Sequence, residues 1–377
     1  MTIPLLEAPL LEARGLSKHY AIPRSARQWA RGEPARVLRA VDGVDLTVTA
    51  GRTLGVVGET GSGKSTLGRL LLRLEQPTAG EVLVDGTPRS RAEGPRQRRD
   101  IQVVLQDPYT SLNPYQKIGS AVAEVLKVAG VSSAEARQAR VQELLEQVGF
   151  PVAWADRKPG QLSGGGRQRV SIARALAAGP RLIVADEPVS ALDVSVQAQV
   201  LNLFQRLQRE LGLAYVFITH DLAVLERIAD RVAVLYLGRI VESGPVEALF
   251  RSAGHPYTQA LLSAAPVLGR RRSTSSAVTG ELPDPASPPS GCAFHTRCPH
   301  AMVVCRTTVP LTTTIPGGLQ VACHLHTQSA PQSSTAQSST DQIGTAKTNP
   351  PQTSTLHQHA PAPAEVPPTP TPPGRPA

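Results

Sequence analysis

The stretch TLGVVGETGSGKST, Thr53 to Thr66, decides the fold of this chain. A short apolar run ends at Gly58, and Gly63, Lys64 and Ser65 follow after four intervening residues. Glycines allow a turn so tight that successive backbone N–H groups point at a phosphate, and the start of a helix adds partial positive charge there. This spacing predicts a buried strand, a phosphate-binding loop and a helix, with Lys64 reaching the terminal phosphates and the Ser65 hydroxyl ligating Mg²⁺. The predicted nucleotide-binding residues are Gly58, Glu59, Thr60, Gly61, Ser62, Gly63, Lys64, Ser65 and Thr66.

Polar side chains also end three other predicted strands. The apolar run RLIVAD ends in Asp186, and Glu187 follows it; QVVLQ ends in Gln106, and YVFIT is followed by His220. Asp186 can hold the hydration shell of Mg²⁺, and Glu187 can polarise an attacking water. Ligands of open parallel α/β sheets bind where the strands end. We therefore predict that these four side chains meet at one rim of a sheet.

A second glycine-rich stretch, LSGGGRQRV, spans Leu162 to Val170. Ser163 and the amides of Gly164 and Gly165 precede a helix-forming run, which predicts a second anion site. The chain thus carries two phosphate cradles about a hundred residues apart.

These motifs resemble, in order and spacing, those of ATP-binding-cassette (ABC) ATPases. GETGSGKST resembles the Walker A motif, LIVADE the Walker B motif and LSGGGRQ the signature, while SALD (Ser190–Asp193) resembles the D-loop. The resemblance covers about residues 11–327. It implies an α/β fold with a P-loop ATPase core, ATP and Mg²⁺ as ligands, Ser65, Gln106 and Asp186 around the metal, and Glu187, His220 and Gln106 as catalytic residues.

In that family two nucleotide domains pack head to tail, and each ATP lies between the Walker A motif of one and the signature of the other. The resemblance therefore implies that Ser163, Gly164 and Gly165 contact the ATP of a partner subunit. Gly166 departs from the family pattern, which usually has glutamine there. Tyr20 occupies the place of the aromatic residue that stacks on adenine, whereas Trp29, in the insertion AIPRSARQWARGEPAR, fits that role less well.

The composition along the chain predicts its domain organisation. Apolar runs alternate with helical patterns over residues 11–265, which predicts the nucleotide-binding domain. A helical subdomain is expected at about 107–180, because residues 119–150 have a helical pattern and no strand. Residues 266–291 read as a linker, and 292–327 as a small cysteine-containing C-terminal region. Residues 328–377 are rich in Ser, Thr, Gln and Pro, which predicts a disordered tail.

The charge and hydropathy of the chain limit its function classes. The 377 residues carry a formal net charge of +9, but this charge is dispersed, which is typical of a solvated surface. No run of 18 apolar residues and no signal-peptide pattern are present, so we expect a chain that stays in the cytoplasm. The two halves of the cassette are contiguous and only one Walker A motif occurs. These features argue against the DNA-repair and translation-factor branches of the family, and against a nucleic-acid partner.

The remaining class is the stand-alone transport subunit. LQDPYTSLNPYQKIG, GHPYTQALLSAAP and GCAFHTRCPHAMVVC with VACHL resemble segments of ATPase subunits of bacterial oligopeptide/dipeptide importers. The resemblance implies a peripheral subunit at the cytoplasmic face of the membrane, paired with a second ATPase (the same or a related chain) and two permease subunits, and served by an extracytoplasmic solute-binding protein. Pro108, Tyr109 and Leu112 are expected permease contacts. Importers of nickel, glutathione or glycosides remain alternatives, as does, more distantly, an ABC ATPase that acts on nucleic acid.

All four cysteines of the chain, Cys292, Cys298, Cys305 and Cys323, fall within 32 residues. A cytoplasmic location argues against disulfides, and the gaps of five, six and seventeen residues lack the close pairs usual for zinc. Such spacing can hold a [4Fe–4S] cluster, and the resembled importer subunits bind one in some members. We expect the cluster, with zinc and free or disulfide-bonded cysteines as alternatives, and expect His295, His300 and His324 to be solvated or structural.

Overall fold

A computed structural model of the protein describes residues 8–32, 35–89, 94–106, 112–264 and 280–327. These residues belong to one compact unit. The predicted disordered tail lies outside the described residues, as does residue range 266–279 of the predicted linker. Within the described part of the chain, no helix is long and apolar enough to cross a lipid bilayer.

The larger of two sheets has eight strands in the order β11-β12-β10-β9-β3-β8-β7-β6. The five strands from β9 to β6 are parallel. Every residue of β3 and β8 is buried, because both faces of a parallel sheet are covered. The four apolar runs predicted to be strands are confirmed as β3, β6, β7 and β8. The strands are β3 (Thr53–Val57), β6 (Ile101–Val104), β7 (Leu182–Asp186), β8 (Ala214–Thr219), β9 (Arg231–Tyr236), β10 (Arg239–Pro245), β11 (Thr312–Ile315) and β12 (Leu319–Ala322).

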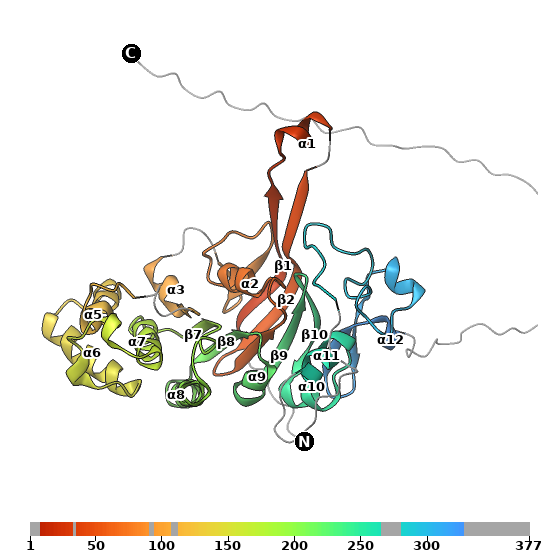
Figure 1. Ribbon diagram of the computed structural model, residues 1–377. Helices are drawn as coiled ribbons and strands as arrows, with labels where there is room; N and C mark the ends of the chain where they lie inside the picture. Colours follow the sequence, from red (N-terminus) through yellow and green to blue (C-terminus); the bar gives the residue numbers. More distant parts are fainter. Residues whose placement is uncertain (1–7, 33–34, 90–93, 107–111, 265–279, 328–377) are drawn as a thin grey trace, which may run out of the picture. The chain divides into compact units, whose positions relative to one another are not determined.

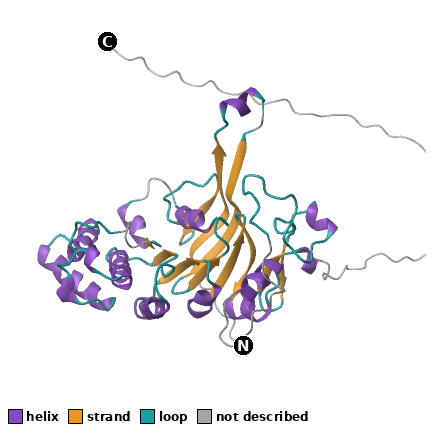
Figure 2. Ribbon diagram, viewed as in Figure 1, coloured by secondary structure: helices purple, strands orange, loops and turns teal. Residues whose placement is uncertain are grey.

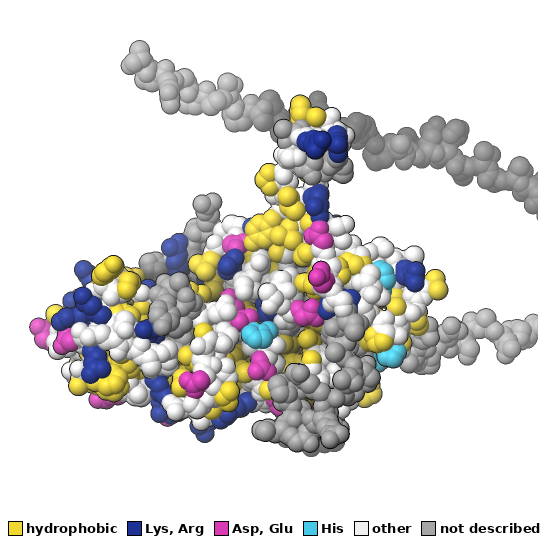
Figure 3. Space-filling view, viewed as in Figure 1, with side chains coloured by type: hydrophobic (Ala, Val, Ile, Leu, Met, Phe, Trp, Pro, Cys, Tyr) yellow, Lys and Arg dark blue, Asp and Glu magenta, His cyan; other side chains and the backbone are white. Residues whose placement is uncertain are grey.

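The smaller sheet has the order β2-β1-β4-β5 and contains a long antiparallel arm. Its strands are β1 (Pro9–Ile22), β2 (Arg36–Thr49), β4 (Ala79–Val84) and β5 (Thr87–Pro88). Strands β1 and β2 extend beyond the sheet, and the short helix α1 (Ala26–Ala30) lies at the tip of this arm (Figure 1). Lys and Arg side chains gather at the tip (Figure 3), where Trp29 is 71% exposed. The tip belongs to the described part of the insertion noted after Tyr20.

Helices surround the larger sheet (Figure 2). The predicted helical segment contains α5 and α6 and no strand, and with α7 these helices lie beyond the β6 edge of the sheet (Figure 1). Helix α8 buries Val200, Leu201, Leu203, Phe204 and Leu207 against the core, whereas Leu211 at its end is 46% exposed. The helices are α2 (Lys64–Leu71), α3 (Pro95–Asp100), α5 (Ile118–Val128), α6 (Ala134–Gln147), α7 (Gly164–Leu176), α8 (Val194–Leu211), α9 (Leu222–Ile228), α10 (Val246–Ser252), α11 (Pro256–Ala264) and α12 (His324–Thr327), with 3₁₀ turns at Val152–Trp154, Pro159–Gln161 and Val303–Arg306.

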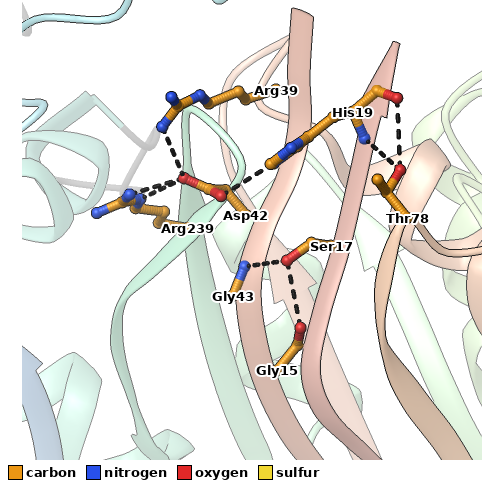
Figure 4. A network of polar contacts seen from close by, with 8 residues as sticks. All are labelled: Gly15, Ser17, His19, Arg39, Asp42, Gly43, Thr78 and Arg239. Atoms are coloured by element: carbon orange, nitrogen blue, oxygen red, sulfur yellow. Dashed lines mark hydrogen bonds and ion pairs between the residues drawn. The ribbon is translucent and has the colours of Figure 1, made fainter.

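A polar network around Asp42 fastens the base of the arm to the larger sheet (Figure 4). The Asp42 carboxylate, on β2, accepts hydrogen bonds from Nε and Nη2 of Arg239 on β10 at 3.0 and 2.7 Å. It also lies 3.0 Å from Nε2 of His19 on β1. Burial alone would raise the pKa of Asp42, but the hydrogen bonds and charges of Arg239 and His19 hold it below its usual range. The network therefore joins three strands of two sheets through one carboxylate.

Candidate functional site

The phosphate loop connects β3 to α2, and its shape depends on two glycines. At Gly63 φ is +105°, and a Cβ there would lie 2.0 Å from the carbonyl oxygen of Ala40. At Gly58 a Cβ would lie 2.2 Å from the carbonyl oxygen of Leu235. Only glycine fits at either position. Backbone carbonyls of strands β2 and β9, which are distant in sequence, therefore lie directly against the loop.

Lys64 lies folded back onto the loop. Its Nζ donates to the carbonyl oxygens of Gly58 and Glu59 at 2.8 and 2.9 Å, and the residue is 5% exposed. Burial lowers the pKa of Lys64, while the nearby carboxylates of Glu187, Asp186 and Glu59 oppose that change. The buried Ser62 hydroxyl has no hydrogen-bond partner among the residues that the structure describes. A glycine cradle, an ammonium group and an unpartnered buried hydroxyl fit a bound phosphate.

Ser65 and Asp186 face each other across the end of β7. The Ser65 hydroxyl donates to the Asp186 carboxylate at 3.4 Å. Burial raises the pKa of Asp186, and the hydrogen bond from Ser65 opposes this. The Ser65 hydroxyl and the Gln106 amide line one cavity, and the Asp186 carboxylate lies beside Ser65. A hydroxyl, an amide oxygen and a carboxylate are oxygen ligands that Mg²⁺ prefers. The residues present therefore fit a Mg²⁺ ion.

Glu187 is held by two of the residues predicted to surround it. The Gln106 amide donates to Oε2 of Glu187 at 3.1 Å, and Nδ1 of His220 lies 3.3 Å from Oε1. The Glu187 backbone has φ of +48°, an unusual value for a residue with a side chain. The structure thus brings Gln106, Glu187 and His220 together at the strand ends.

A cavity of about 540 Å³ is lined by most of the predicted site residues, although Asp186 is not among its lining residues. Its lining from the predicted site consists of Thr60, Gly61, Gly63, Lys64, Ser65, Thr66, Gln106, Glu187 and His220. Leu38 and Ala40 of the arm and Pro285 complete it. Sequence reasoning missed Pro285, because it lies in a stretch whose Pro- and Ser-rich composition indicated a linker. A larger cavity, of about 730 Å³, lies between β10 and the cysteine-containing region and shares none of these residues.

Tyr20, predicted to stack on adenine, does not line the 540 Å³ cavity. Its hydroxyl donates to the Glu75 carboxylate, and Nζ of Lys18 lies 5.1 Å from the centroid of its ring. Burial and the hydrogen bond to Glu75 raise the pKa of Tyr20. Adenine stacking by Tyr20 therefore stays a prediction.

The signature residues begin α7. The Ser163 hydroxyl caps the helix by accepting a hydrogen bond from the Gly166 amide at 3.2 Å. Gly164 and Gly165 form the first turn. Among the described residues that line the cavity of Lys64 and Glu187, none of the three appears. Their role toward a partner's nucleotide stays a prediction.

The four cysteines are free and lie close enough to affect one another's ionisation. Burial, together with the charges of the other three thiols, raises the pKa of Cys323 to about 11. His295 and His324 hydrogen-bond to the carbonyl oxygens of Cys292 and Thr308. However, the described residues contain no group of three or more His, Cys, Asp or Glu side chains placed to hold a metal ion. The predicted [4Fe–4S] or zinc site is not formed in this structure.

The described residues confirm none of the predicted permease contacts. Pro108 and Tyr109 lie outside the described residues. Leu112 is 3% exposed and packs in the core of the helical region, so its side chain is not available to a partner here.

Comparisons with known proteins agree in both halves of the chain. Residues 41–190 match the family described as ABC transporter, and residues 241–305 match the oligopeptide/dipeptide transporter C-terminal region. A probable peptide ABC transporter ATP-binding protein of Sinorhizobium fredii is 51% identical over 325 residues, which cover 85% of this chain and 91% of the relative. A putative peptide import ATP-binding protein of Brucella abortus is also 51% identical, over 294 residues that cover 77% of this chain and 87% of the relative.

Solved structures share the fold. A dimeric ATP-binding cassette in a post-hydrolysis state with ADP and phosphate superimposes with a TM-score of 0.53 at 29% identity, covering 63% of this chain and 98% of that one. The cbiO1 protein of Clostridium perfringens, part of an ABC transporter complex, gives 0.56 at 25% identity, covering 65% and 92%.

Proposed function

The chain belongs to the ATP-binding proteins of peptide-importing ABC transporters, and we propose on this premise that it hydrolyses ATP to power the uptake of peptides. The observation that carries the proposal is the meeting of the phosphate loop, Glu187 and His220 in one cavity, with Asp186 accepting a hydrogen bond from Ser65 and Glu187 accepting one from Gln106. The match of residues 241–305 supports the peptide class of solute.

We propose the following roles in hydrolysis. Lys64 exchanges its hydrogen bonds to the loop carbonyls for the phosphates of ATP. Ser65, Asp186 and Gln106 would hold Mg²⁺, which neutralises phosphate charge when bound. Glu187 accepts a proton from the attacking water, while the hydrogen bond from Gln106 orients its carboxylate and the His220 imidazole lies beside it.

Glu187→Gln tests this assignment, because it keeps the shape and removes the base. We expect ATP hydrolysis to fall about 10²- to 10⁴-fold while ATP binding persists. Lys64→Ala is the matched comparison, and it should lose binding and hydrolysis together. A Glu187→Gln variant that turns over ATP at the wild-type rate would contradict the assignment.

The same variant tests the transport role in cells that lack the wild-type chain. Wild type should restore uptake of labelled di- and oligopeptides, and Glu187→Gln should not. Uptake of nickel, glutathione or glycosides measured in parallel distinguishes the alternative solutes. Restored uptake of one of these, with no change for peptides, would reassign the solute.

We propose that the chain acts at the cytoplasmic face of the membrane, with a second ATPase subunit and two permease subunits. The dimeric state of the superimposed cassette and the names of the relatives support these partners. An extracytoplasmic solute-binding protein would deliver the peptide. Co-purification of differently tagged copies tests whether the second ATPase is identical to this chain or is a related chain.

A finer part of the proposal is that Cys292, Cys298, Cys305 and Cys323 hold a structural [4Fe–4S] cluster. Its support is the clustering of all four cysteines within 32 residues of the sequence; cluster binding would require their deprotonation. Protein purified without oxygen should be brown and contain about four irons per chain, and Cys298→Ser should lose both colour and iron. Colourless protein with one zinc per chain would favour zinc, and protein with neither metal would contradict both.

A further inference from the structure

Residues distant in sequence from the phosphate loop contact it from outside the cavity. Nη1 of Arg297 donates to the Glu59 carboxylate at 3.0 Å, and the Arg297 side chain is only 7% exposed. The backbone N–H of Glu59 donates to the Tyr257 hydroxyl at 2.9 Å. Both partners of Glu59 are distant in sequence, 238 and 198 positions away. The second residue of the loop is thus fixed through its side chain and its backbone.

A buried aromatic cluster supports these two contacts. The rings of Tyr236, Tyr257 and Phe294 lie 4.7 to 5.4 Å apart, centroid to centroid. The Arg297 guanidinium lies 5.9 Å from the centroid of the Tyr236 ring. Phe294 and Arg297 both lie between Cys292 and Cys298 in the sequence. The cysteine-containing segment therefore connects to Glu59 through packed, buried rings.

The segment before the cysteines also reaches the cavity. Pro285 lines it, and the Pro285 carbonyl accepts from the Arg39 amide at 3.4 Å. Leu282 lies against the loop, because a Cβ on Gly61 would be 3.4 Å from its Cδ2. Asp284 pairs with Arg36 of the arm. Residues 282–297, named here the clamp segment, thus contact the phosphate loop and one wall of the cavity.

We propose that the clamp segment is a working part of the ATP site, and that Arg297 is a positioning residue that holds the phosphate loop in its binding conformation through Glu59. This inference rests on the proposed function as an ATP-binding subunit. The amides of the loop must converge before they can bind a phosphate, and a loop that is already ordered loses less freedom on binding. Without Arg297, the Glu59 carboxylate would lose its partner beside an anionic ligand and the loop would relax.

The Glu59→Ala variant distinguishes a positioning role of the Arg297–Glu59 pair from a purely electrostatic effect of these residues on ATP affinity. It removes a negative charge near the phosphates, so electrostatics alone predicts tighter ATP binding. Positioning predicts the opposite sign, about tenfold weaker binding, for both Glu59→Ala and Arg297→Ala. The double variant should bind no more weakly than either single variant, because both remove the same contact. Electrostatics alone predicts that the double variant returns to the wild-type affinity.

The measurement is the dissociation constant of a non-hydrolysable ATP analogue with Mg²⁺, on the full chain. Arg306→Ala is the matched control: it removes the same charge from an exposed site in the same region, and it should bind like wild type. Arg297→Lys should recover part of the affinity, and thermal unfolding without nucleotide shows whether each variant is folded.

Glu59→Ala protein that is folded and binds as tightly as wild type, or more tightly, would overturn the inference even if Arg297→Ala did not fold. Weaker binding by Glu59→Ala, with a double variant that binds no more weakly than either single variant, would establish it. If Arg297→Ala does not fold, Arg297→Lys replaces it in the double variant. A wild-type chain that binds no nucleotide is a different result, because it would refute the proposed function and this inference with it.

Discussion

Glu187 carries its carboxylate on a backbone conformation that costs free energy. A φ of +48° costs a side-chain-bearing residue on the order of 1 kcal/mol, so the surroundings must enforce it. Its N–H donates to the carbonyl of Ile218 on β8 at 2.9 Å, and its own carbonyl accepts from the Ser190 hydroxyl at 3.0 Å. Ser190 opens the SALD stretch. The predicted base is therefore fixed by β8 on one side and by the D-loop on the other.

Gly165 and Gly166, adjacent in the signature, differ in how much space the structure leaves for a side chain. A Cβ on Gly165 would lie 2.5 Å from Cγ1 of Val196, so glycine allows α7 to approach α8 there. A Cβ on Gly166 would meet only ordinary contacts, the nearest being the Ser163 hydroxyl oxygen at 3.4 Å. Nothing in the described structure explains why Gly166 replaces the usual glutamine. The Gly166 amide still donates to Ser163, so the helix cap does not depend on its side chain.

At the scale of elements, Asp42 joins β2 to β10 at the base of the arm (Figure 4). We expect Asp42→Asn to lower the free energy of unfolding at pH 7 by about 1–3 kcal/mol, because the Arg239 side chain loses its carboxylate partner. The pKa of Asp42 is lowered in the folded protein, so its stabilisation is present above the pKa of an unfolded aspartate, about 4, and is lost as the pH falls through the lowered value.

Urea denaturation at several pH values between 7 and 3 checks this. The difference in the free energy of unfolding between wild type and Asp42→Asn should shrink at the acid end of this range. Asp156→Asn is the control, because the Asp156 side chain is 85% exposed and its pair with Lys117 should contribute less than about 1 kcal/mol at any pH. A difference for Asp42→Asn that stays constant with pH would contradict the expectation.

The elements that sequence could predict are those whose pattern is local. The apolar runs of β3, β7 and β8 are continuous. Asp186 and Glu187 come at the end of β7 and His220 directly after β8, so these three residues could be predicted to lie at one rim. The clamp segment could not be placed, because its Pro- and Ser-rich composition is that of a linker. Its position depends on long-range contacts, such as Arg297 with Glu59, that no short stretch encodes. Tyr20 shows the same limit, because its partner Glu75 is 55 positions away.

At the scale of the whole molecule, the described residues do not bring the two predicted anion sites together in one cavity. Lys64 begins α2 at the end of β3, whereas Ser163 begins α7 in the helical region, and only Lys64 lines the described cavity. A second copy, packed head to tail, would place each signature on the other chain's nucleotide. The chain by itself then contains two half-sites and no complete one.

Complementation between two damaged subunits tests this arrangement. Ser163→Arg should leave ATP binding to the monomer nearly intact and block closure of the dimer, whereas Lys64→Ala removes nucleotide binding. In a mixed dimer of the two variants, one composite site carries both lesions and the other carries neither. An equal mixture in which half of the dimers are mixed should therefore recover about a quarter of the wild-type ATPase activity, although each variant alone is inactive.

Obligatory coupling between the two sites would hide this recovery, so the experiment is repeated with Glu187→Gln in both subunits. That change prevents turnover and leaves trapped ATP as the readout. Mixed dimers isolated through two different affinity tags should retain one ATP, because one composite site is intact, whereas dimers with both signatures and both loops unaltered should retain two. Tagged mixed dimers that form but retain no ATP would show that the signature serves its own chain's nucleotide, since each subunit would then carry one lesion in its own site.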